Sequence, residues 1–406
     1  MKTEKTIVRR WWILAVGVIT MLFAGIIYAW SILKIPFAGE IGYDASALAL
    51  NFTLTMCFFC LGGLLSSRLI KLVGTRLSIL LAGLLSGVGF VLSGLVGGNG
   101  IAILYVTYSL MSGLGIGIAY IVIISAVNVW FPDRRGLSSG ALMMGFGGSS
   151  LIIGNLADKM FQSSLGWKNT YVAIGIALGV VLALSAIVID RPKEGDALPA
   201  PKAGKGAARE CFEAKDYKPF EMIGRFTFWR AFVFLICISA VGNSVISFAR
   251  DLALSIGASA ALATTLVGVL AVCNGLGRII TGAVFDALGR RFTMTAASIL
   301  TVLAAAITLV AIHLESLPLC IVGLCLVGMS YGTSPTVSSA FTMSFYGQKH
   351  FASNLGIMNF NLMCASFIAT ACTSILKSTG GYTMPFVLLL SLSVIALSLN
   401  FSIKKP

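Results

Sequence analysis

The sequence has few charged residues. Only 11% of its 406 residues are Asp, Glu, Lys or Arg, and it contains two histidines. Soluble domains carry about 25% charged residues, so this chain has too little charge to cover a surface that faces water. The scarcity excludes a soluble enzyme, a nucleic-acid-binding protein and a disordered chain. It also leaves few groups for acid–base chemistry.

The cysteines lack the spacing of a metal or redox centre. Nine are scattered singly, mostly within apolar stretches, and no histidine lies near the C-x-x-C formed by Cys57 and Cys60. Such cysteines are typical of apolar packing. We therefore expect no metal site and no cofactor. An enzyme inside the membrane would need a nucleophile and base or a metal cluster at depth, and none appears.

Apolar residues are abundant, at 57% of the chain. One bilayer crossing takes about 20 such residues, so the apolar content suffices for about a dozen crossings. The sequence predicts an all-α membrane protein with twelve transmembrane helices in two pseudo-symmetric six-helix bundles. The predicted spans are 11–35, 45–67, 77–97, 101–130, 136–158, 168–190, 226–249, 257–284, 292–313, 316–345, 351–376 and 381–403.

The positions of the basic residues predict the orientation. With the N-terminus inside, 23 Lys and Arg residues fall on the inner side and five on the outer side. This bias predicts that both termini are cytoplasmic, and it accounts for the net charge of +14 without a nucleic-acid partner. Short tails without a sorting signal favour a prokaryotic inner membrane, and we expect the chain to function as a monomer in the lipid bilayer.

The chain divides into two similar halves. Residues 191–224 are rich in Pro, Gly and charge, which predicts a cytoplasmic linker between an N-terminal bundle, 1–190, and a C-terminal bundle, 225–406. Two motifs that begin at Gly63 and Gly74, and a third that ends at Gly140, recur 219, 215 and 216 residues later. Two homologous halves around a midplane site are the construction of alternating-access transporters.

One repeated motif resembles a known family. The segment 282–291, Gly-x-x-x-Asp-x-x-Gly-Arg-Arg, resembles the signature loop of the major facilitator superfamily. In this resemblance Asp286 caps a helix end and pairs with arginines across the cytoplasmic face, which latches one conformation. The first-half copy has Ser67 where an acid is usual. The predicted latch residues are Asp286, Arg290, Arg291, Arg76, Arg134 and Arg135.

Four further segments narrow the resemblance. The segments 28–31, 130–136, 274–278 and 345–356 resemble the oxalate/formate antiporter family and the proton-linked monocarboxylate transporters. The resemblance implies a secondary active transporter of small monocarboxylates such as lactate or pyruvate, with proton coupling. The alternative is an exchanger of the oxalate/formate type, and a counter-anion requirement would identify it.

Arg278 is the one cation predicted deep within a span, away from the span ends. Charges at bilayer depth are expensive and indicate function. No acid lies three or four residues from Arg278, so the guanidinium needs an anion, and its planar fork suits a carboxylate. The alternative is that Arg278 donates to backbone carbonyls or extends to the cytoplasmic end. We predict that Arg278 binds the substrate carboxylate.

The neighbours of Arg278 bear on substrate charge and proton coupling. In the resemblance, oxalate-exchanging members carry a lysine in the eleventh span, at or next to the position of Leu362, and this sequence has no lysine there. One cation fits a monocarboxylate better than a dianion. Asn274 stands where the animal monocarboxylate transporters carry a proton-binding aspartate. Entry of the proton on the substrate and exchange against a second anion both stay open.

Other polar residues within the spans are weaker candidates. A hydroxyl of Tyr120 or Tyr331 would suit a carboxylate, although both lie in Gly-rich segments where helix packing explains them equally well. Tyr28, Cys57 and Asn359 complete the predicted substrate-binding set. A ligand sensor is disfavoured because only a short tail follows the last span. The two-half repeat and the absence of a charged ring disfavour a channel.

Overall fold

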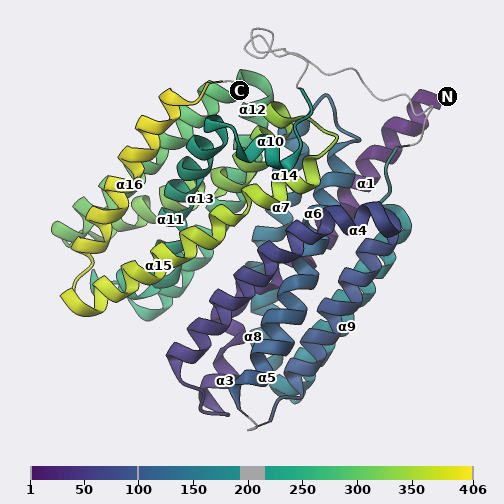
Figure 1. Cartoon of the computed structure of the whole chain (residues 1–406). Helices are drawn as coiled ribbons and strands as arrows, with labels where there is room; N and C mark the ends of the chain where they lie inside the picture. Colours follow the sequence, from purple (N-terminus) through teal and green to yellow (C-terminus); the bar gives the residue numbers. More distant parts are fainter. Residues whose placement is uncertain (1, 98–99, 193–214, 405–406) are drawn as a thin grey trace. The chain divides into compact units, whose positions relative to one another are not determined.

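The computed structural model describes residues 2–97, 100–192 and 215–404, and every regular element in these ranges is helical (Figure 1). A bilayer offers no water to backbone N–H and C=O groups, so a spanning segment must satisfy them within its own helix. The long apolar stretches of the sequence therefore become helices. The fold class predicted from the sequence is confirmed in this respect.

The helices pack into two units. The first unit contains residues 1–138, 145–202 and 350–357, and the second contains residues 139–144, 203–349 and 358–406. Helix α7 (Arg135–Ser149) thus contributes its middle turns to the second unit, and most of α14 (Phe351–Met358) belongs to the first. Residues 193–214 of the predicted linker lie outside the described residues, and the predicted bundle boundaries stay predictions.

The first unit is built on the long helix α4, which packs against α6 and α9. Short 3₁₀ and π segments interrupt three of its spans, at η1 (Gly25–Ala29), η2 (Tyr105–Gly113) and η3 (Ser150–Gly154). The α-helices of this unit are α1 (Lys2–Ala24), α2 (Trp30–Leu33), α3 (Ile35–Gly39), α4 (Ala45–Gly94), α5 (Ile101–Leu104), α6 (Leu114–Asn128), α8 (Asn155–Phe161) and α9 (Gly166–Val188).

The second unit holds the helix that carries Arg278. Helix α12 packs along α13 and α16, while α11 packs against α13, α15 and α16 (Figure 1). An apolar core that includes Val241, Leu270 and Phe386 fills the space between these helices. The helices are α10 (Pro219–Ile223), α11 (Phe226–Ser255), α12 (Ala260–His313), α13 (Leu317–Tyr346), α15 (Phe360–Thr379) and α16 (Thr383–Ser402).

Two helices are long enough to contain two spans each. Ten helices of the described chain are apolar and long enough to cross a membrane. Within α4 the helical geometry breaks at Gly74, with φ 79°, and within α12 it breaks at Gly289, with φ 77°. Glycine has no Cβ and adopts this left-handed conformation at little cost. The breaks divide the ten helices into twelve spans, and they occupy matching positions of the internal repeat.

The outer face of the helices is apolar. On α9, Ile176, Val180, Leu184 and Ile187 follow one another at helical spacing, and they are 50% to 69% exposed. Water would make such an exposed stripe unfavourable, whereas the hydrocarbon of a bilayer accepts it. This pattern identifies α9 as a helix that faces lipid.

Candidate functional site

Arg278 lies buried inside the second unit. Only 2% of its surface is exposed. Its Nε donates to the Oδ1 of Asn274, one helical turn earlier on α12, at 3.1 Å. Its Nη1 donates to the backbone carbonyl of Met143 on α7, at 2.5 Å. Both acceptors are neutral oxygen atoms, so the positive charge is solvated by dipoles and is not neutralised.

The backbone around Arg278 is held by a close helix contact. A Cβ placed on Gly332 of α13 would lie 2.2 Å from the carbonyl oxygen of Asn274 and 2.9 Å from the amide nitrogen of Arg278. Thr336, one turn further along α13, donates its hydroxyl to the carbonyl of Arg278 at 3.4 Å. Glycine at position 332 therefore allows α13 to approach α12 at the segment that carries the cation.

The unused donors of Arg278 define what this position can do chemically. A guanidinium has more N–H donors than the two bonds to Asn274 and Met143 require. Within the described part of the chain, Arg278 forms no ion pair with Asp or Glu. A buried cation without a counter-ion is costly, and a carboxylate is the complementary anion for its planar fork.

Two other predicted residues lie in the same unit, Tyr331 on α13 and Asn359 directly before α15. Tyr331 of α13 donates its hydroxyl to the Oδ1 of Asn243 on α11, at 2.7 Å. Asn359 accepts a long hydrogen bond from Ser338 at 3.5 Å. Arg278, Asn274, Tyr331 and Asn359 are thus all buried in the second unit. Asn243 was missed by the sequence analysis, although an asparagine within an apolar span is a visible signal.

The remaining predicted substrate-binding residues lie in the first unit. The rings of Tyr28 and Tyr120 both contact Phe146, with centroids 5.3 Å and 4.9 Å apart and edge-to-face geometry. Phe59 packs against Tyr120 from α4. Cys57 is half-buried with a free thiol. The rings of Tyr28, Phe59, Tyr120 and Phe146 form an aromatic cluster. Helix packing of this kind was the alternative to substrate binding that the sequence left open for Tyr120.

The predicted latch residues lie in different local environments. Arg290 is 3% exposed, and its guanidinium lies 5.2 Å from the ring centroid of Phe345. Arg76 pairs with Asp190 at 3.2 Å near the surface. Arg134 lies 3.8 Å from a carboxylate oxygen of Asp133. The side chain of Arg135 is outside the described part, and the latch roles of Asp286 and Arg291 stay predictions.

A buried ion pair in the first unit was not predicted from the sequence. Arg10 of α1 donates through Nη1 to Asp133, which precedes α7, at 2.7 Å, and their side chains are 8% and 3% exposed. The guanidinium of Arg10 also lies 5.0 Å from the ring of Phe131. The pair joins positions 123 residues apart, a distance over which sequence spacing gives no signal.

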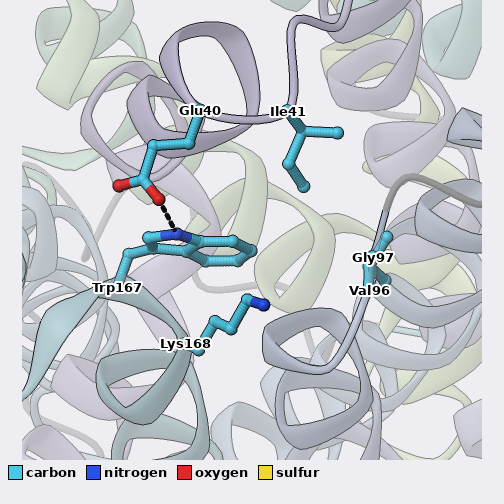
Figure 2. A pocket seen from close by; sticks show the side chains of 6 residues that line it. All are labelled: Glu40, Ile41, Val96, Gly97, Trp167 and Lys168. Atoms are coloured by element: carbon cyan, nitrogen blue, oxygen red, sulfur yellow. Dashed lines mark hydrogen bonds between the residues drawn. The ribbon is translucent and has the colours of Figure 1, made fainter.

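A cavity of about 290 Å³ opens in the first unit away from these residues. Figure 2 shows Glu40 accepting a hydrogen bond from the indole N–H of Trp167, with Lys168 on the other side of the indole ring. Glu40 and Lys168 are exposed, so both charges are well solvated. Across the described residues, no group of three His, Cys, Asp or Glu side chains could hold a metal ion.

The helices form two units, and the second buries Arg278, which has no acidic partner among the described residues. This is the architecture of a membrane transporter. Residues 13–370 match the family model of the Major Facilitator Superfamily, and the chain belongs to this superfamily. Its members are transporters and not enzymes, and their fold has twelve transmembrane helices. This match confirms three predictions from the sequence: the superfamily, the twelve transmembrane helices, and that the protein is a transporter and not an enzyme.

Two relatives cover most of the chain. The MFS-type transporter YhjX of Escherichia coli (strain K12) is 25% identical over 355 residues, which are 86% of this chain and 84% of the relative. The oxalate:formate antiporter of Oxalobacter formigenes is 24% identical over 395 residues, 96% of this chain and 90% of the antiporter. These relatives confirm the predicted resemblance to the oxalate/formate antiporter family.

Solved structures confirm the fold. The proton:xylose symporter XylE superposes with a TM-score of 0.75 at 15% identity, over 99% of this chain and 97% of the symporter. The transporter FucP, solved in an outward conformation, gives a TM-score of 0.70 at 13% identity, over 97% of this chain and 99% of FucP. At such low identity the likeness concerns the fold alone.

Proposed function

We propose that this protein is a secondary active transporter of small monocarboxylate anions, with Arg278 as the residue that binds the carboxylate. The observation that carries the proposal is the isolation of this cation. Arg278 is 2% exposed, its described partners are neutral, and it retains free N–H donors. A substrate carboxylate would supply the missing negative charge during the alternating exposure of the site.

The charge balance of the site favours a monoanion. The resemblance puts a lysine of oxalate exchangers at or next to Leu362, which is an apolar side chain only 6% exposed on α15. A dianion bound at Arg278 alone would leave one negative charge in a medium of low dielectric constant, which is unfavourable. Lactate, pyruvate and similar anions avoid this cost.

The environment of Arg278 suggests how a proton would be coupled. Asn274 contacts the guanidinium with an amide oxygen, and an amide does not take up a proton near neutral pH. No Asp or Glu in the described chain pairs with Arg278. We propose that a coupled proton enters together with the carboxylate, and that the chain works as a monomer in a prokaryotic inner membrane with both termini cytoplasmic.

The second candidate is exchange of organic anions. It is favoured by the relative named as an oxalate:formate antiporter, whose similarity extends over 96% of this chain. Exchange requires a counter-anion on the opposite side of the membrane, whereas symport requires a proton gradient. The two functions therefore predict different conditions for uptake.

The test is uptake of labelled L-lactate into proteoliposomes. Wild type, Arg278→Ala and Lys377→Ala are compared with and without an inward proton gradient, and with formate or oxalate loaded inside. Lys377→Ala removes the same charge at an exposed position on α15, so it controls for a general effect of charge. Size-exclusion profiles of the purified variants establish that each is folded.

We expect gradient-driven lactate uptake by wild type and Lys377→Ala, and none by Arg278→Ala. Uptake that needs internal formate or oxalate and ignores the gradient would select the exchanger. If folded Arg278→Ala transports as well as wild type, the role assigned to Arg278 is wrong.

A further inference from the structure

A second polar cluster links three helices of the second unit. Tyr331 of α13 donates to the Oδ1 of Asn243 on α11 at 2.7 Å, and the Nδ2 of Asn243 donates to the hydroxyl of Ser366 on α15 at 3.3 Å. Each contact is a side-chain hydrogen bond between different helices. The hydroxyl of Ser239 joins the same three helices through Ser334 and Asn361. Each polar group of such a network must be desolvated, so its hydrogen bonds have to be satisfied within the bundle.

The cluster is connected to the Arg278 site through α13. Tyr331 directly precedes Gly332, the residue that lies against Asn274 and Arg278. Pro335 stands inside the same helix, and it has no N–H to donate to the carbonyl of Tyr331 four residues earlier. The turn of α13 that carries Tyr331 thus lies next to both the close contact with α12 and an interruption of the helical hydrogen bonding.

The geometry fixes Asn243 as a hydrogen-bond donor. Its Oδ1 is taken by the Tyr331 hydroxyl, so the amide is oriented with Nδ2 toward Ser366. An amide nitrogen has two N–H donors, and the Ser366 bond uses one. Tyr331 and Ser366 are buried, at 3% and 9% exposure, whereas Asn243 is only half-buried. Asn243 is therefore the member of the cluster that keeps a donor available.

We propose that Asn243 binds a hydroxyl or keto oxygen of the substrate, distinct from the carboxylate that binds Arg278, and that Tyr331 and Ser366 position its amide. This inference rests on the proposed function and narrows its substrate class. The preferred substrates are short monocarboxylates that carry a hydroxyl or keto oxygen in addition to the carboxylate. Unsubstituted carboxylates such as propionate lack the acceptor for the Asn243 N–H.

The test compares transport of substrates that differ by one oxygen atom. Proteoliposomes containing wild type, Asn243→Ala, Ser366→Ala or the control Asn169→Ala take up lactate, 3-hydroxypropionate or propionate, and KM and kcat are measured for each. Asn169 is an exposed asparagine whose amide donates to a carbonyl of the same segment. Asn169→Ala therefore makes the same chemical change as Asn243→Ala at a position outside the cluster.

We expect wild type and Asn169→Ala to prefer one hydroxy acid over propionate, and Asn243→Ala to lower that preference about tenfold through KM. Tenfold corresponds to about 1.4 kcal/mol, within the range of one hydrogen bond. Ser366→Ala acts in the same direction with a smaller factor, because it removes a partner and not the donor. The position of the favoured hydroxyl identifies which carbon bears the recognised oxygen.

The outcomes separate the two proposals. If Asn243→Ala changes transport of all three substrates by the same factor, the preference for the hydroxy acid is unchanged. That result would overturn the role of Asn243 and leave the monocarboxylate function intact. If wild type transports none of the three acids under either a proton gradient or counter-anion loading, the proposed function fails and this inference fails with it.

Discussion

The ion pair between Arg10 and Asp133 provides the sharpest stability prediction. The two side chains are almost fully buried, and Nη1 of Arg10 lies 2.7 Å from Asp133. Asp133→Asn keeps the size of the side chain but removes its charge, which leaves a buried guanidinium without a counter-ion. Breaking such a pair from one side costs about 3 kcal/mol or more, because the remaining charge stays desolvated.

An exposed pair in the same unit serves as the matched control. Arg76 and Asp190 lie 3.2 Å apart, with side chains 56% and 30% exposed. Water screens this pair, so Asp190→Asn should cost about 1 kcal/mol or less. The same substitution at the two aspartates thus differs mainly in burial.

The assay is thermal unfolding of the purified protein in detergent, followed by the fraction that remains monodisperse after heating. At about 2 °C per kcal/mol for a unit of roughly 200 residues, Asp133→Asn should lower Tm by about 6 °C or more, and Asp190→Asn by about 2 °C or less. The double variant Arg10→Met with Asp133→Leu should recover part of the loss, since it leaves no uncompensated charge.

Equal shifts for Asp133→Asn and Asp190→Asn would refute the reasoning, because they would mean that burial of the pair does not govern its contribution. A double variant that is less stable than Asp133→Asn would also contradict it. That result would show that the polar contacts of Arg10 outweigh the cost of desolvating its charge.

Two glycine substitutions give further predictions. Gly332→Ala should raise the KM for lactate, since its Cβ would push against the backbone at Asn274; the control Gly148→Ala, which has open space around it, should match wild type in the same uptake assay. Gly289→Ala should lower Tm, because φ 77° costs a residue with a Cβ about 1–2 kcal/mol. Unchanged transport in the first case, or unchanged Tm in the second, would count against these assignments.

The sequence predicted most of the fold because bilayer constraints are local. A span needs about 20 apolar residues, and its hydrogen bonds form within the segment, so composition along the chain is sufficient to locate it. The glycines at 74 and 289 were visible as equivalent positions of the repeat. That each permits a sharp break inside one continuous helix became clear only from the backbone angles.

The sequence predicted those parts of the candidate site that depend on a single residue or on neighbours within one helical turn. Arg278 stood out as a cation at depth, and its contact with Asn274 follows from a spacing of four residues on one helix. The roles of Tyr28 and Tyr120 were not predictable, because the sequence does not give the direction in which either ring points, and the Gly-rich segment around Tyr120 suits helix packing as well as a substrate. In the structure both pack against Phe146.

The sequence by itself determined the class of protein, the spans and the cation deep within a span, since these depend on composition and local spacing. Tertiary structure alone decided the partners: Met143 for Arg278, Asn243 for Tyr331 and Asp133 for Arg10. These contacts join residues 135, 88 and 123 positions apart. Such pairs arise from the way helices approach and rotate, and no periodicity along the chain encodes which side chains then meet.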